Sequence, residues 1–118
     1  MTGSNEAELL GLDASIFSVV GDACGSNYNV GLNKAGQLRL YAEKTSGNGN
    51  TLTITATGVT ITKIVVAFGS KIGSFTVNGV AGSSSTLEYE INGSEVVIKN
   101  VDTAGTQLHF TSIEIFYE

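Results

Sequence analysis

The sequence predicts a single all-β domain, an antiparallel, jelly-roll-like β-sandwich of about eight strands. Apolar and polar residues alternate along several short segments, as they do in half-buried strands, and few segments show a helical period. Turn-forming pairs such as Asn78-Gly79 and Asn92-Gly93 separate these segments at short intervals. The length of 118 residues fits one domain with one core.

The start of the chain differs from the rest. Residues 1–11 are expected to be an artificial start followed by a linker, and residues 12–118 the β-sandwich module. The only helix candidate is Asn5–Leu10, because acids near its start suit the helix dipole. The first strand is expected at Asp13–Val20. Gly21–Gly36 then reads as a long Gly- and Asn-rich loop, of a length typical of functional or mobile loops.

The segments after this loop repeat every two residues. The clearest is Thr51–Thr57, where apolar residues alternate with threonines. The inward-facing parity changes between Phe110 and Ile113, which predicts a β-bulge near Thr111 or Ser112. The other expected strands contain Leu38–Tyr41, Ile64–Phe68, Phe75–Val77, Leu87–Ile91, Val96–Ile98, Leu108–Phe110 and Ile113–Tyr117.

Composition and charge indicate which classes of partner the protein is expected to bind. Charged residues make up 14% of the chain, below the roughly 25% typical of soluble domains. A surface rich in hydroxyl and amide groups suits the outside of a cell, where neutral glycans are common. The net charge is −5 and the six basic residues never cluster, so nucleic acid and anionic membranes are not expected partners.

The chain is expected to be a domain of a larger exported protein, located outside the cell or at its surface. The longest apolar run, Ile64–Phe68, is far shorter than a membrane span, so no membrane insertion is expected. Cys24 is the only cysteine, and its Gly/Ser/Asn-rich surroundings offer no activating partner.

No catalytic centre is expected. The single histidine, His109, is predicted to face outward between Leu108 and Phe110, as a surface residue with no positioned acid or nucleophile. Glu88 and Glu90 share one strand face, and their pattern favours a solvated face over a glycosidase pair.

No metal or other cofactor is expected either. One histidine and one cysteine are too few for a structural zinc site. Asp13, Asp22 and Asp102 are separated and lack a calcium-loop pattern.

Binding is the remaining class of function. Sugars are held by aromatic rings and by hydrogen-bonding side chains, and the candidate ligand-binding residues are Tyr28, Asn29, Asn33, Arg39 and Tyr41, with Lys44 as a further exposed group. Arg39 and Tyr41 share a strand face, and a packed outer pair on the sheet is the alternative interpretation. The chain has no tryptophan, which counts against a flat, high-affinity polysaccharide platform.

Several motifs carry a family resemblance, and they cover nearly the whole chain from Leu12 onward. They are Leu12-Asp13-Ala14-Ser15-Ile16-Phe17-Ser18-Val19, Gly36-Gln37-Leu38-Arg39-Leu40-Tyr41-Ala42, Gly47-Asn48-Gly49-Asn50-Thr51-Leu52-Thr53-Ile54, Phe75-Thr76-Val77-Asn78-Gly79, Val97-Ile98-Lys99-Asn100-Val101 and Ile113-Glu114-Ile115-Phe116-Tyr117. Together they resemble β-sandwich accessory modules of secreted and surface proteins from gut-type bacteria, which occur beside glycoside hydrolases, nucleases or Ig-like repeats. The resemblance implies a fold and a location, and no catalytic residue.

These observations favour a non-catalytic carbohydrate- or cell-wall-binding accessory module of a secreted bacterial protein. The alternative is a structural spacer, an adhesin or a protein-interaction domain of a surface protein. The expected partner is accordingly a glycan or a surface protein. An enzyme is the third hypothesis, and turnover abolished by His109→Ala would support it.

Overall fold

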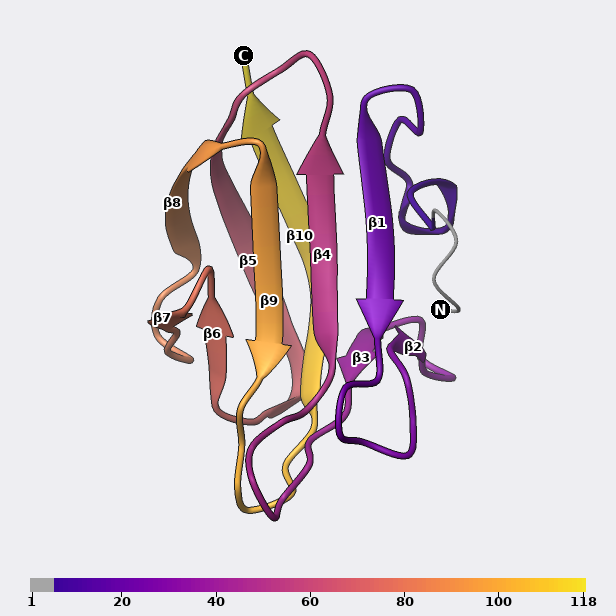
Figure 1. The fold of residues 1–118 in the computed structure, drawn as a ribbon, viewed down its shortest axis with the longest axis vertical. Helices are drawn as coiled ribbons and strands as arrows, with labels where there is room; N and C mark the ends of the chain where they lie inside the picture. The colour runs from indigo at the N-terminus through magenta and orange to yellow at the C-terminus, as the bar shows by residue number, and fades with distance from the viewer. Residues whose placement is uncertain (1–5) are drawn as a thin grey trace.

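A computed structural model describes residues 6–118, and it is a β-sandwich of two five-stranded antiparallel sheets (Figure 1). The predicted all-β sandwich is therefore confirmed, with ten strands in place of about eight. The strands are β1 (Phe17–Asp22), β2 (Gly31–Leu32), β3 (Leu38–Leu40), β4 (Thr51–Ala56), β5 (Ile61–Ile72), β6 (Phe75–Val77), β7 (Val80–Ala81), β8 (Glu88–Gly93), β9 (Glu95–Asn100) and β10 (Leu108–Tyr117). Within residues 6–118, no helix has the length and apolar character needed to cross a bilayer.

The chain passes from one sheet to the other at every connection except β2–β3 and β6–β7. The first sheet has the order β1-β4-β9-β6-β7, and the second sheet has the order β2-β3-β10-β5-β8. The β6–β7 hairpin turns at Asn78 and Gly79, whose φ angles of 48° and 79° are those of the tight turn that the sequence predicts. This repeated crossing brings residues distant in sequence to the same end of the sandwich.

The core lies between the sheets and follows the two-residue period. Along β4 the inward residues Leu52, Ile54 and Ala56 are buried, whereas the threonines between them are partly exposed. The same alternation in β3 places Leu38 and Leu40 in the core and points Arg39 away from it. Strand β3 therefore presents its polar residue on the outer face of the second sheet.

The predicted bulge is confirmed. The pairing of β10 with β5 shifts register between Phe110 and Ser112, which lie opposite Phe68 and Ala67. The extra residue lets both Phe110 and Ile113 contact the core, so Leu108–Tyr117 forms one continuous strand rather than two.

The structure corrects the sequence interpretation near the start of the chain. The expected helix is only a 3₁₀ turn, η1 (Glu8–Leu10), and Asn5 lies outside the described residues. Ala7, within the segment expected to be a linker, is fully buried in the core. Strand β1 runs over Phe17–Asp22 instead of Asp13–Val20, because the Asp13 carboxylate accepts hydrogen bonds from the backbone N–H and hydroxyl of Ser15 and so forms a turn.

The expected loop at Gly21–Gly36 is also interrupted. Strand β1 continues to Asp22, and the two-residue strand β2 pairs with β3. A strand of two residues has no room for an alternating pattern, which is why the sequence did not reveal it.

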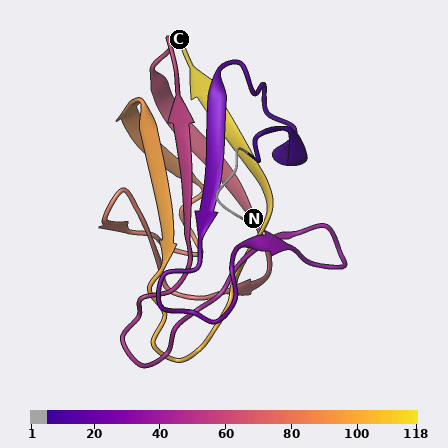
Figure 2. The same cartoon turned by 45° about the vertical axis from the view of Figure 1, so that its right-hand side comes forward.

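Three connections gather at one end of the sandwich, here called the loop end: β1–β2 (residues 23–30), β3–β4 (residues 41–50) and β9–β10 (residues 101–107). They lie together at the bottom of both Figure 1 and Figure 2, opposite the C-terminus. The candidate residues Tyr28 and Tyr41 belong to two of these connections.

Candidate functional site

Asn50 holds two connections of the loop end together. Its side chain is fully buried, and its Nδ2 donates to the carbonyls of Ala23 and Tyr28 over 3.1 and 2.7 Å. Its Oδ1 accepts the backbone N–H of Tyr41 over 2.8 Å. One side-chain amide therefore fixes the backbone at both tyrosines of the site.

Asn100 adds the third connection. It is also fully buried, and its Nδ2 donates to the carbonyls of Leu40 and Thr106, each over 3.1 Å. Its backbone N–H donates to the Asn50 carbonyl over 2.9 Å. The two asparagines thus connect β3, β4 and the β9–β10 loop, so the loop end has a fixed internal frame.

Three of the predicted site residues form a row on this frame. The rings of Tyr28 and Tyr41 lie 5.1 Å apart between centroids, and the Arg39 guanidinium carbon lies 4.7 Å from the centroid of Tyr41. We call this arrangement the Arg39–Tyr41–Tyr28 row. Tyr28 is 64% exposed, whereas Tyr41 and Arg39 are half-buried. Tyr28 is therefore the ring that is open to a ligand.

A shallow hollow of about 310 Å³ lies beside Tyr28. It is lined by Gly25, Ser26, Asn27, Tyr28, Ala42, Glu43, Lys44, Thr45 and Gly105. Lys44, a further candidate from the sequence, is among these residues. The hollow presents hydroxyl, amide and charged groups next to an exposed ring. Sites that bind saccharides combine these kinds of group.

Glu43 gives the hollow a fixed negative charge. Its carboxylate accepts hydrogen bonds from the backbone N–H groups and the hydroxyls of Thr45 and Ser46. The Ser46 and Thr45 hydroxyls, then the Thr45 backbone N–H, lower the pKa of Glu43 to about 2.

The side chains of Asn29 and Asn33 organise the backbone. The Asn29 Oδ1 accepts the N–H of Val30, and its Nδ2 donates to the carbonyl of Gly21. The Asn33 Oδ1 accepts the N–H groups of Ala35 and Gln37 in the β2–β3 turn. The structure thus brings together Tyr28, Arg39 and Tyr41, but not the two asparagines.

His109 is buried, which corrects its expected surface position. Only 4% of it is exposed, although it points to the outer face of the second sheet. Its Nδ1 lies 2.9 Å from the Ser70 Oγ, and its Nε2 lies 2.8 Å from the Gln107 Oε1. Burial, followed by the charges of Arg39 and Lys71, lowers the pKa of His109. Side chains from neighbouring positions cover it, an effect that strand parity alone does not predict.

The carboxylates considered from the sequence are engaged elsewhere. Glu88 forms an ion pair with Lys63 over 2.9 Å. The Asp102 carboxylate accepts the backbone N–H groups of Ser74, Ala104 and Thr106. Within residues 6–118, no group of three or more histidine, cysteine or acidic residues is placed to hold a metal ion.

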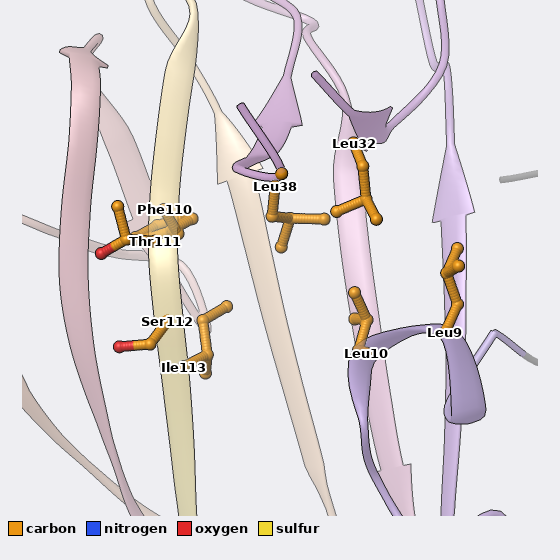
Figure 3. A pocket seen from close by; sticks show the side chains of 9 residues that line it. Leu9, Leu10, Leu32, Leu38, Phe110, Thr111, Ser112 and Ile113 are labelled. Carbon is orange, nitrogen blue, oxygen red and sulfur yellow. The ribbon is translucent and has the colours of Figure 1, made fainter. Parts of the chain in front are cut away.

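A second hollow, of about 190 Å³, is more apolar than the first. Figure 3 shows Leu9 and Leu10 from η1 facing Leu32 and Leu38, while the hydroxyls of Thr111 and Ser112 point away from these leucines. It offers fewer polar groups that could select a ligand than the hollow beside Tyr28.

Comparisons of the chain with protein-family models, with curated proteins and with solved structures gave no match. Function is therefore inferred from the residues and their geometry. Among residues 6–118, the Arg39–Tyr41–Tyr28 row and its hollow combine an exposed ring with free polar groups.

Proposed function

We propose that this chain is a non-catalytic carbohydrate- or cell-wall-binding accessory module of a secreted bacterial protein, and that it binds through the Arg39–Tyr41–Tyr28 row. The observation that carries the proposal is the contact of both Tyr28 and Arg39 with the ring of Tyr41, beside a polar hollow. Tyr28 comes from the β1–β2 connection, whereas Arg39 and Tyr41 come from β3 and the residue that follows it, and the fold brings these two segments together.

The proposed binding mode uses the exposed ring of Tyr28 as a stacking surface. The apolar C–H face of a sugar packs on the ring, and its hydroxyls bond to polar groups around the hollow. Because Asn50 already fixes the backbone of Tyr28 and Tyr41, little conformational entropy is lost on binding. A shallow hollow suits part of a polysaccharide chain better than an enclosed small molecule.

The proposed location follows from the composition and from the family resemblance. A weakly charged, hydroxyl-rich surface suits the cell exterior, and the module would keep a larger exported protein near its substrate or its cell wall. This part of the proposal is tested by the domains that adjoin the chain in its full-length protein. A neighbouring glycoside hydrolase supports it, whereas neighbouring Ig-like repeats support the spacer or adhesin role.

The binding proposal is tested by affinity electrophoresis of the whole chain in gels containing neutral or acidic polysaccharides, followed by a glycan array. Tyr28→Ala should weaken retention about three- to tenfold, because the stacking surface is lost. The matched control is Phe116→Ala, which removes a ring that is 41% exposed at the opposite end of β10.

Retention that both substitutions reduce equally would argue against this site. Absence of retention on every polysaccharide, with capture of a protein partner instead, would replace the proposal with the interaction-domain alternative.

A further inference from the structure

Arg39 has no neutralising partner within residues 6–118. The one ion pair in this part of the chain joins Lys63 to Glu88, although acids exceed bases and the net charge is −5. Lys34, Lys44, Lys71 and Lys99 likewise form no ion pair within residues 6–118. Arg39 differs from these lysines because its guanidinium contacts an aromatic ring, that of Tyr41.

The guanidinium of Arg39 is oriented by its surroundings. Its Nε is shielded from solvent and has no hydrogen-bond partner among residues 6–118. Nη1 and Nη2 are not shielded in this way, and no hydrogen bond within residues 6–118 engages them. The outer edge of the guanidinium therefore presents two parallel donors, the geometry that matches a carboxylate end-on.

The surroundings of Arg39 are positive on one side. Arg39 lies opposite His109 in the pairing of β3 with β10, and the charges of Arg39 and Lys71 both act on that histidine. Arg39 and Lys71 therefore add their positive potential on the outer face of the second sheet. Both positive charges would attract an anion bound there.

The hollow beside Tyr28 contains charged groups of its own. Glu43 lines the hollow beside Tyr28, and its carboxylate is held ionised by Thr45 and Ser46. Lys44 lines the same hollow, so charged groups of both signs are present there. Arg39 thus supplies a cation beside Tyr41, and Glu43 and Lys44 supply one charge of each sign at the hollow beside Tyr28.

We propose that the saccharide bound by this site is acidic, with a uronic acid carboxylate held by Nη1 and Nη2 of Arg39 and an adjoining sugar ring packed on Tyr28. The inference rests on the proposed function, because it names the ligand class of the same site. Hydroxyl-bearing sugar units extend from there over the hollow, where Glu43 and Lys44 are among the polar groups.

The test compares two polymers that differ only in the carboxylate: a polyuronate, and the same polymer after its carboxyl groups are reduced to neutral hexose. Retention and titration calorimetry with the whole chain should give binding to the polyuronate that is at least about tenfold tighter. Arg39→Gln should remove this difference, whereas Arg39→Lys should keep part of it. Lys34→Gln, which removes one exposed positive charge outside the row, should leave it unchanged.

Each other outcome is informative. Equal, Tyr28-dependent binding of both polymers overturns the inference and leaves the proposed function intact. Equal binding of polyglutamate, which has the charge without the sugar rings, overturns the saccharide assignment as a whole. If Lys34→Gln also loses the preference for the polyuronate over the reduced polymer, the preference depends on the net charge of the protein. That result would overturn the role of Arg39. Thermal unfolding of each variant establishes that it is folded.

Discussion

The side-chain Nδ2 of Asn50, a residue with no exposed surface, donates a 2.7 Å hydrogen bond to the backbone carbonyl of Tyr28, whose ring is largely exposed. The same amide accepts the N–H of Tyr41. A residue that no ligand can touch therefore fixes the backbone that carries both rings of the proposed site.

Asn50→Asp tests this frame by keeping the acceptor for Tyr41 and removing the donor to Ala23 and Tyr28. Two carbonyls in a buried setting lose their partner, so the free energy of unfolding should fall by about 2–4 kcal/mol in urea titration. Asn27→Ala, at an exposed position of the same loop, is the control and should change it little. A loss of equal size in both variants would contradict the role of Asn50.

Gly49→Ala is expected to destabilise the loop end. A Cβ at Gly49 would lie 2.6 Å from the Asn100 carbonyl oxygen and 2.7 Å from the Tyr41 carbonyl oxygen, and backbone atoms cannot move aside cheaply. A loss of about 1–3 kcal/mol should appear in thermal or urea unfolding. Gly31→Ala is the matched control, since nothing lies within 4 Å of its Cβ position. Unchanged stability in Gly49→Ala would show that the three loops are not packed as described.

The architecture could be predicted because burial imposes a two-residue period on strands such as β1, β4 and β9. The alternation in Thr51–Ala56 and the parity change near Thr111 depend only on which side chains face the core, and both are confirmed. The two-residue strands β2 and β7 could not be predicted, because they are too short to show a two-residue period.

The site could be predicted only in part. Exposed rings in a long loop and on the following strand pointed to Tyr28 and Tyr41, but their contact depends on long-range packing. Asn50 resembled an ordinary turn residue, because the Gly47-Asn48-Gly49-Asn50 motif is typical of a turn, and Asn100 was assigned no role of its own. Their buried hydrogen bonds join segments up to 60 residues apart, and no local pattern encodes such a contact.

Asp102 should stabilise the fold until the solution becomes strongly acidic. The N–H groups of Ser74, Thr106 and Ala104 lower its pKa below 3.8, with that of Ser74 contributing most. Its folded-state pKa is below its unfolded-state value, so its contribution is present above about pH 3.8 and is lost as pH falls through the folded-state pKa. Asp102→Asn should cost about 1–3 kcal/mol at neutral pH and much less at about pH 2. If Asp102→Asn lowers the free energy of unfolding equally at both pH values, the ionised carboxylate of Asp102 is not the acceptor that stabilises the fold.

His109 should make stability depend on pH in a higher range. Burial, then Arg39 and Lys71, lowers its pKa below 6.5 in the folded state. The unfolded chain therefore binds the proton more tightly, and protonation favours unfolding. The stability that neutral His109 allows is present above about pH 6.5 and is lost as pH falls through the folded-state pKa.

His109→Gln keeps hydrogen-bonding groups beside Ser70 and Gln107 but cannot titrate. The decline in the free energy of unfolding between about pH 7.5 and about pH 5.5 should therefore be smaller in this variant than in the parent chain. Because His109 is the only histidine, its proton NMR titration reports the folded-state pKa directly. A titration midpoint at or above 6.5, or an unchanged decline in the variant, would show that this imidazole is solvated rather than held neutral beneath Arg39.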